Sequence, residues 1–118
     1  MKMNNKEFSK ILEERTKSFA VRILKFSSGL PGSVEERVLK NQLSKSGTSI
    51  GANYREANRA RSKADFSSRI KISESEASET VYWLEVIKDF GNGTEGLDEL
   101  VVEVKELLAI FSSISKKL

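Results

Sequence analysis

The sequence predicts an all-α fold, a single four-helix-bundle domain that spans residues 1–118. One proline and seven glycines in 118 residues leave little turn chemistry for a β-sheet protein. Two clusters of turn residues, at 27–32 and 91–96, interrupt a chain whose apolar residues recur three and four apart, as on one helix face. We therefore expect four helices, at roughly 6–28, 34–60, 63–90 and 96–117.

The amino-acid composition excludes several classes of function. The chain has no histidine and no cysteine, which removes disulfides, the usual zinc sites, Glu-x-x-His di-iron sites and most hydrolytic triads. No paired nucleophile and base stands out, so we expect a protein that is not an enzyme and has no cofactor or metal. The absence of a signal-peptide pattern and of an apolar run of about 20 residues favours a cytoplasmic location without membrane contact.

Capping residues mark where the helices begin. Ser33 and Glu36 form an S-x-x-E capping box at the start of the second helix. Ser62 and Asp65 repeat this pattern before the third helix, although neither glycine nor proline marks that boundary. Thr94 is the expected cap of the fourth helix.

The first and fourth helices each carry one apolar face. On the first helix, the residues in one arc are Phe8, Ile11, Leu12, Phe19, Ile23 and Phe26. The fourth helix has a seven-residue repeat, with Leu97, Val104, Phe111 and Leu118 in one position and Leu100, Leu107 and Ile114 in the other. Such repeats are typical of bundle packing.

The third helix has apolar residues on two faces, and a bundle core needs only one. Phe66, Ile70, Ala77 and Leu84 form the first face. The apolar residues outside the main faces of the first and third helices are Val21, Leu24, Ile72, Trp83, Val86 and Phe90. We expect these six to form an interface between copies of the chain. The alternative is a wider core stripe that covers both faces.

A polar stripe follows the apolar face of the second helix. Its members, spaced four, three, four and three apart, are Gln42, Ser46, Ser49, Asn53 and Glu56. We expect a structural polar network that joins them to Glu76 and Glu79 of the third helix and fixes the helix register. Gly47 and Gly51 thin the second helix and allow close approach of a neighbour. A catalytic use of Glu56, Glu76 and Glu79 is the less favoured alternative, because no base and nucleophile pair accompanies them.

Charge is distributed unevenly along the sequence. Residues 1–63 hold 14 basic and 6 acidic side chains, whereas residues 64–118 hold 6 basic and 11 acidic ones. Basic residues are densest where the second and third helices meet, at Arg55, Arg59, Arg61, Lys63, Arg69 and Lys71. This pattern indicates a basic corner that binds nucleic acid. The alternative is a solvated helix end whose charges pair with acidic residues of the later helices. No aromatic stacking platform is evident in the sequence.

Several spaced motifs resemble a known family. They are Gln42-Leu43, Lys45-Ser46, Ser49-Ile50, Asn53 and Glu56-Ala57, then Arg59, Arg61-Ser62 and Asp65-Phe66, and finally Ser75-Glu76-Ala77-Ser78-Glu79 before Trp83-Leu84. This arrangement is similar to the signature of the 23S rRNA intervening-sequence proteins. The chain departs from the family pattern at Tyr54-Arg55, where small apolar residues are usual, at Ala57-Asn58 in place of Glu-Gly, and at Ala77-Ser78 in place of Gly-Ser.

The resemblance implies an antiparallel up-down four-helix bundle that assembles as a ring-like homo-oligomer, typically a homopentamer. It also implies a relation to the accessory variability determinant of diversity-generating retroelements, a basic pentamer that binds nucleic acid and a reverse transcriptase. We therefore expect a non-catalytic oligomer that binds structured RNA, or DNA, through the basic corner. The alternative is a scaffold that docks a reverse transcriptase or another protein without touching nucleic acid.

Overall fold

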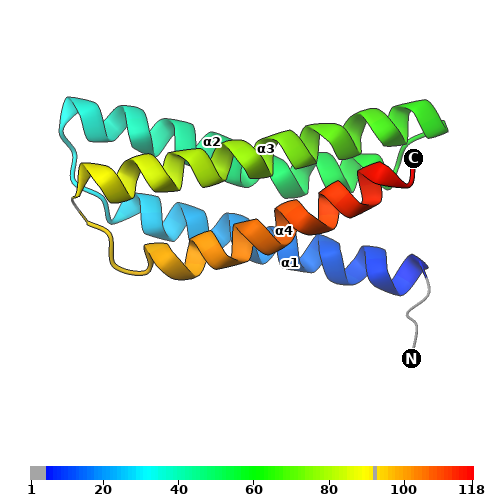
Figure 1. Cartoon of the computed structure of the whole chain (residues 1–118), viewed down its shortest axis with the longest axis horizontal. Helices are drawn as coiled ribbons and strands as arrows, with labels where there is room; N and C mark the ends of the chain where they lie inside the picture. Colours follow the sequence, from blue (N-terminus) through cyan, green and yellow to red (C-terminus); the bar gives the residue numbers. More distant parts are fainter. Residues whose placement is uncertain (1–4, 92) are drawn as a thin grey trace.

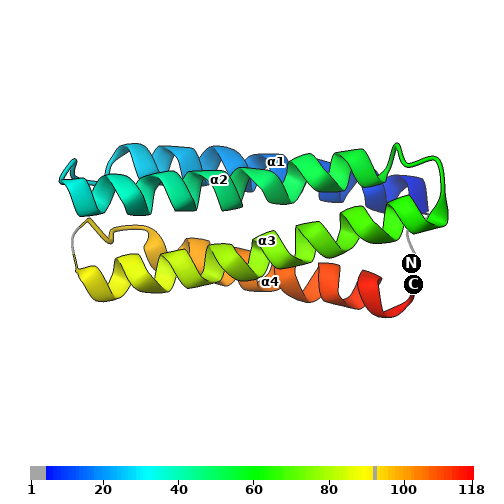
Figure 2. The same ribbon diagram turned by 90° about the horizontal axis from the view of Figure 1, so that it is seen from above.

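Four helices form a bundle along a molecule that measures 44 × 29 × 20 Å (Figure 1). The computed structural model describes residues 5–91 and 93–118, and it contains no strand within them. The helices are α1 (Asn5–Ser28), α2 (Val34–Ala57), α3 (Lys63–Phe90) and α4 (Leu97–Lys116). The start of α1, the α2–α3 connection and the C-terminus lie at one end of the long axis, and the other two connections lie at the opposite end (Figures 1 and 2).

Two of the three predicted caps are confirmed. The Ser33 hydroxyl accepts a hydrogen bond from the Glu36 backbone N–H at 3.1 Å and donates to the Glu36 carboxylate. The Ser62 hydroxyl accepts from the backbone N–H of Asp65, also at 3.1 Å. The second helix ends at Ala57, three residues earlier than expected, because the N–H groups of residues 58–60 turn back to carbonyls of its last turn.

The prediction that Thr94 caps the last helix is wrong. The N-cap of α4 is Gly96, which makes no side-chain cap bond, and Thr94 contributes only its backbone carbonyl to the N–H of Leu97. Gly91, Gly93 and Gly96 all have positive φ angles, of 94°, 67° and 81°. The α3–α4 connection therefore reverses direction through left-handed backbone that favours glycine, without a side-chain cap.

The core draws on all four helices. Its largest fully buried side chains are Tyr54, Phe19, Phe111, Ile23, Leu43, Ile50, Ile70, Leu84, Ile87, Leu97, Leu107 and Val104. The Tyr54 and Phe111 rings meet edge to face, with centroids 5.4 Å apart. Two predicted core residues are outside it. Ile11 is 51% exposed, because it lies at the edge of the α1 arc, and Leu118 is 55% exposed, because α4 ends at Lys116.

Glycines allow α1 to pack closely on α2. A Cβ atom at Gly47 would lie 2.8 Å from Cγ2 of Ile23, and one at Gly51 would lie 2.9 Å from Oγ1 of Thr16. Ile23 and Thr16 are themselves buried, so neither neighbour has free space to move into. The two glycines therefore set the distance between α1 and α2, as the sequence predicts.

Gly47→Ala should destabilise the protein even though alanine is the better helix former. Overpacking costs about 1–3 kcal/mol, and the gain in helix propensity is about 1 kcal/mol. Because three Ile23 carbons would lie within 3.2 Å of the new methyl group, we expect the cost to exceed the gain, with a net loss of up to about 2 kcal/mol. Urea denaturation measures this difference. Gly32→Ala is the control, since nothing lies within 4 Å of the place that its methyl group would take, and it should not lose stability. A Gly47→Ala protein as stable as the wild type would contradict the proposed packing constraint.

Candidate nucleic-acid interface

The six predicted nucleic-acid-binding residues do not form one cluster. Arg59, Arg61 and Lys63 are exposed and lie together at the α2–α3 connection. Arg55 is exposed as well, but its Nε lies 3.6 Å from Oε1 of Glu13 on α1. The structure therefore brings three of the six together at the tip, and Arg55 belongs to the neighbouring α1–α2 surface.

The remaining two residues lie farther along α3, on different sides of it. Arg69 is half-buried, and its Nη1 donates to Oδ1 of Asn53 on α2 at 3.1 Å. Lys71 is exposed and borders a surface hollow that Leu108 of α4 also lines. Arg69 is therefore held at the contact between α2 and α3, and Lys71 lies beside the surface hollow that α3 and α4 share. The six residues of the predicted basic corner therefore lie on more than one surface of it.

Positive charge gathers at one end of the bundle more strongly than the sequence order suggests. This basic end comprises residues 5–12, 50–72 and 111–118, which hold ten basic and three acidic side chains. At the opposite end, residues 21–41, 82–91 and 93–103 hold five basic and eight acidic side chains. The difference arises because the start of α1, the α2–α3 connection and the end of α4 meet at the same end (Figure 1).

Glu13 organises the edge of the basic end. One carboxylate oxygen pairs with Arg55, and the other accepts a hydrogen bond from Nδ2 of Asn58 at 2.8 Å. Both partners lie at the C-terminal end of α2, so this carboxylate ties α1 to the start of the α2–α3 connection. Sequence reasoning missed it, because Glu13 is more than 40 residues away from both partners along the chain.

The predicted polar network exists in a narrower form between α2 and α3. A 2.9 Å hydrogen bond joins the hydroxyls of Ser46 and Thr80, and the Ser73 hydroxyl donates to the Ile50 carbonyl at 2.9 Å. Ser46, Ser73 and Thr80 are all buried. We call these three residues, together with the Asn53–Arg69 pair, the polar seam.

The other predicted network residues lie outside the polar seam or at its edge. Glu56 is exposed, and Ser49 is half-buried with its hydroxyl bonded to the Lys45 carbonyl of its own helix. Glu79 is exposed and accepts a hydrogen bond from Nε1 of Trp83. These two carboxylates therefore face solvent, and the fully buried members of the seam are neutral hydroxyls, which cost less to desolvate.

Gln42 and Glu76 are half-buried beside the seam. Burial raises the pKa of Glu76, and the nearby Glu79 carboxylate raises it further, against the opposing charge of Lys45. The Glu76 carboxylate is therefore partly desolvated, at the edge of the contact between α2 and α3.

An ion pair that the sequence does not reveal joins α1 to α4. Arg15 binds Glu103 through two hydrogen bonds, from Nε at 2.8 Å and from Nη2 at 2.7 Å. Oε1 of Glu106 lies 3.4 Å from the same Nη2. The hydrogen bond from Arg15 lowers the pKa of Glu103 and, reciprocally, raises the pKa of the guanidinium. A pair of this fork geometry orients the two helices as well as attracting them.

The six predicted interface residues differ in exposure. Val21 and Leu24 on α1 are exposed, as are Ile72 and Phe90 on α3. Trp83 and Val86 are half-buried and pack against the core. These two residues therefore follow the alternative expectation, in which a wider core stripe covers the second apolar face of the third helix. Exposed apolar residues beyond the prediction include Val34 and Val38 on α2.

Two other kinds of feature are absent from the described part of the chain. No group of three or more carboxylates gathers closely enough there to hold a metal ion. None of the described helices combines the length and apolar character needed to cross a bilayer.

Comparison with known proteins points to one family. The family model described as 23S rRNA-intervening sequence protein matches residues 9–113. A solved structure from Bacteroides thetaiotaomicron, described as a protein of unknown function from the S23 ribosomal protein family, is 36% identical to this chain. The match covers 92% of this chain and 97% of the other, with a TM-score of 0.83. No curated protein matches the sequence significantly.

Glu103→Gln should destabilise the protein at neutral pH by about 1 kcal/mol, because the pair is only partly shielded from water. The folded-state pKa of Glu103 lies below its ordinary value of 4.5, so the bond stabilises the fold above that pH. Its contribution is lost as the pH falls through the folded-state pKa. The free energies of unfolding of the wild type and the variant should therefore converge at low pH, and urea denaturation at a series of pH values measures them. Glu85→Gln, at an exposed position of α3, is the control, and a pH-independent difference for Glu103→Gln would contradict the assignment.

Proposed function

The chain belongs to the 23S rRNA-intervening sequence protein family, and we propose that it is a non-catalytic, homo-oligomeric protein that binds RNA through its basic end. The observation that carries the proposal is the excess of ten basic over three acidic side chains at that end. We propose a cytoplasmic location as well, because structured RNA is available to the protein there.

Arg59, Arg61 and Lys63 are the best candidates for contact with phosphates. All three are exposed, and none of them takes part in an ion pair within the described residues. Basic side chains that contact phosphates release condensed counterions, which makes the affinity depend steeply on salt. Arg55 contributes less in this proposal, because Glu13 already neutralises part of its charge.

We further propose that the antiparallel up-down bundle assembles as a ring, the pentamer that the family resemblance implies. Each chain exposes two separate apolar surfaces. One is a compact patch of Val21 and Leu24 on α1, and the other is a discontinuous patch on α3, whose members Ile72 and Phe90 lie about 27 Å apart along the helix. Two different patches on one chain suit a head-to-tail interface, which closes into a ring when the rotation between neighbours allows it. A ring would repeat the basic end once per subunit and multiply its attraction for RNA.

A second candidate function is a scaffold that docks another protein, for example a reverse transcriptase. Val34 and Val38 support it, because they are 65% and 53% exposed and lie at the end of α2 far from the basic end. Apolar side chains that self-assembly does not cover are suited to a partner protein. Both functions can operate in one oligomer, since they use opposite ends of the bundle.

Reversal of three charges should abolish most of the RNA binding. The variant Arg59→Glu/Arg61→Glu/Lys63→Glu is expected to bind a structured RNA hairpin at least about tenfold more weakly, with a salt slope reduced by roughly 2–3. Fluorescence polarisation across a potassium chloride series measures both quantities.

The control for this experiment is Lys25→Glu/Arg37→Glu/Lys88→Glu, which reverses three exposed charges at the opposite end of the bundle. Because Lys88 also pairs with Asp98 at 3.2 Å, circular dichroism first checks that this variant folds. The control variant should bind as the wild type does, apart from a small loss of long-range attraction. Equal losses in both variants would mean that net charge alone attracts RNA and that the basic end is not a site.

Light scattering coupled to size exclusion should show an assembly of several 13.2 kDa chains. Leu24→Asp and Ile72→Asp, made separately, should each shift the protein toward the monomer, because each places a carboxylate in one half of the proposed interface. Lys105→Asp, at an exposed position of α4, is the control. A wild-type protein that elutes as a monomer of 13.2 kDa would refute the ring.

A further inference from the structure

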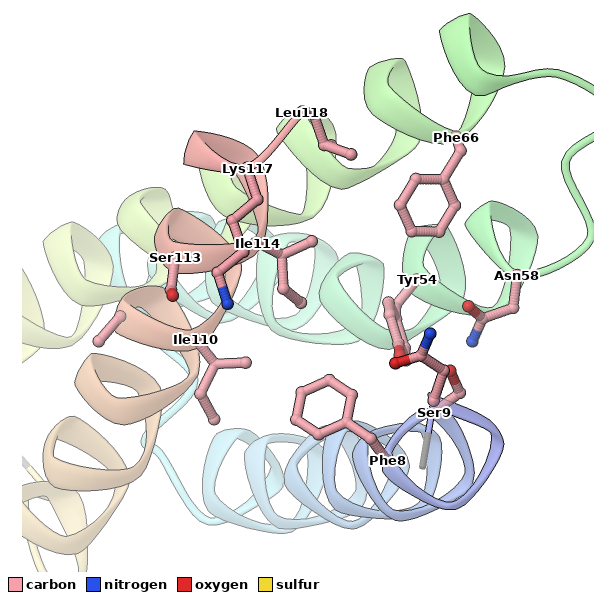
Figure 3. A pocket seen from close by; sticks show the side chains of 12 residues that line it. Phe8, Ser9, Tyr54, Asn58, Phe66, Ile110, Ser113, Ile114, Lys117 and Leu118 are labelled. Atoms are coloured by element: carbon pink, nitrogen blue, oxygen red, sulfur yellow. The ribbon is translucent and has the colours of Figure 1, made fainter. Parts of the chain in front are cut away.

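A pocket of about 790 Å³ opens at the basic end, in the space between the start of α1 and the end of α4. All four helices contribute to its lining, through Phe8 on α1, Tyr54 on α2, Phe66 on α3, and Ile110 and Ile114 on α4 (Figure 3). Its volume lies within the range of about 300–1,000 Å³ that is usual for small-molecule pockets. The pocket is therefore large enough for a nucleobase together with its ribose.

The pocket offers the aromatic surface that the sequence does not reveal. Phe8 and Phe66 lie on opposite sides of the opening, and Tyr54 lies between them (Figure 3). Tyr54 is 2% exposed and is held by its edge-to-face contact with Phe111, so it forms a rigid floor. Phe8 and Phe66 are half-buried, which leaves part of each ring open to the pocket. They are 58 positions apart in the sequence, which is why no aromatic platform is visible there.

Polar groups at the rim can read the edge of a base. Asn58 donates through Nδ2 to Glu13, which fixes its amide and leaves the carbonyl oxygen of that amide as a hydrogen-bond acceptor. Ser9 and Ser113 bring hydroxyls from α1 and α4, and both line the pocket. The wall from α4 is aliphatic, through residues such as Ile110 and Ile114, but the amide and the two hydroxyls supply hydrogen bonds that a flat, polar-edged molecule can use and an alkyl chain cannot.

The charge around the pocket favours an anionic ligand. Lys117 lines it directly, and Arg59, Arg61 and Lys63 lie on the connection that follows Asn58. A nucleotide combines the three properties that these surroundings match: a π face, a hydrogen-bonding edge and a phosphate.

We propose that this pocket binds an unpaired nucleobase of RNA, stacked against Phe66 or Phe8, while the basic residues of the α2–α3 connection hold the adjacent phosphates. This inference rests on the proposed function and narrows it, because it names single-stranded or looped RNA as the substrate class. Bases inside a duplex are stacked on their neighbours and cannot enter such a pocket without being flipped out.

The proposal predicts a difference between single-stranded RNA and a duplex of the same length. Phe66→Leu and Phe8→Leu remove a stacking face but keep an apolar side chain of similar bulk. At least one of the two variants should weaken binding of the single strand roughly 5- to 150-fold, and both should leave binding of the duplex unchanged. Fluorescence polarisation with labelled oligonucleotides measures both, and circular dichroism confirms that the variants fold. Tyr82→Leu is the matched control, because Tyr82 is a 57% exposed aromatic residue of α3 outside this pocket.

A second measurement uses the wild-type protein and does not depend on the folding of any variant. Single-stranded RNA that contains 4-thiouridine is irradiated with the protein, and the cross-linked residue is identified by mass spectrometry. Cross-links to Phe8, Tyr54 or Phe66 support the proposal. Cross-links confined to residues outside the pocket overturn it.

The outcomes separate this inference from the proposed function. If the wild type binds RNA but Phe66→Leu and Phe8→Leu bind single strands normally, the pocket is not a base site and RNA binding by charge stands. If these variants lose only the binding of the fluorescent fatty acid cis-parinaric acid, the occupant is a lipid and the inference is overturned. If the wild type binds neither form of RNA at low salt, the proposed function fails and the inference fails with it.

Discussion

The register of α2 against α3 is set by hydroxyl groups inside the bundle, and the rest of the molecule depends on it. Ser46 bonds to Thr80, and Ser73 bonds to the Ile50 carbonyl, all in the buried interior. Sliding one helix by a residue would break both bonds between the helices. Thr80 and Ser46 would keep bonds to carbonyls of their own helices, whereas the buried Ser73 hydroxyl would lose the partner that it has here, at about 1–3 kcal/mol. Apolar contacts alone discriminate less sharply, because one aliphatic side chain can replace another in the same space. The seam therefore favours one register of α2 against α3.

The position of the α2–α3 connection explains the concentration of charge. Four helices that alternate along one axis return the C-terminus to the end at which α1 begins, and the α2–α3 connection lies there as well (Figure 2). Three segments that are far apart in the sequence thus bring ten basic side chains to one end. Among the described residues, Arg59, Arg61 and Lys63 take part in no ion pair. Arg55 differs, since it pairs with Glu13, which at the same time positions Asn58 at the rim of the pocket.

The proposed binding surface divides two tasks between two kinds of residue. Exposed basic side chains on a short connection attract phosphates over a distance of roughly a Debye length, without regard to sequence. The pocket lies on rigid helices, and its floor is a buried tyrosine packed on Phe111. Stacking requires a fixed surface, because a ring that must first be ordered loses part of the binding free energy to entropy. In the proposed mode of binding, the short connection would provide attraction, and the helices would provide discrimination between paired and unpaired RNA.

Local information in the sequence was enough to predict the four helices, two of the three caps and the close approach of helices at Gly47 and Gly51. Apolar periodicity, capping boxes and the missing side chain of glycine all act over a few residues. The sequence also placed Ser46 and Asn53 on the flank of α2 that meets α3. It could not show that Glu56 and Glu79 face solvent, that Arg55 and Lys71 leave the tip, or that Arg15 reaches Glu103. The aromatic pocket was equally invisible, because Phe8, Tyr54 and Phe66 belong to three helices. Contacts within one helix follow from the 3.6-residue repeat, whereas contacts between helices depend on their rotation and separation, and only the tertiary structure decides those.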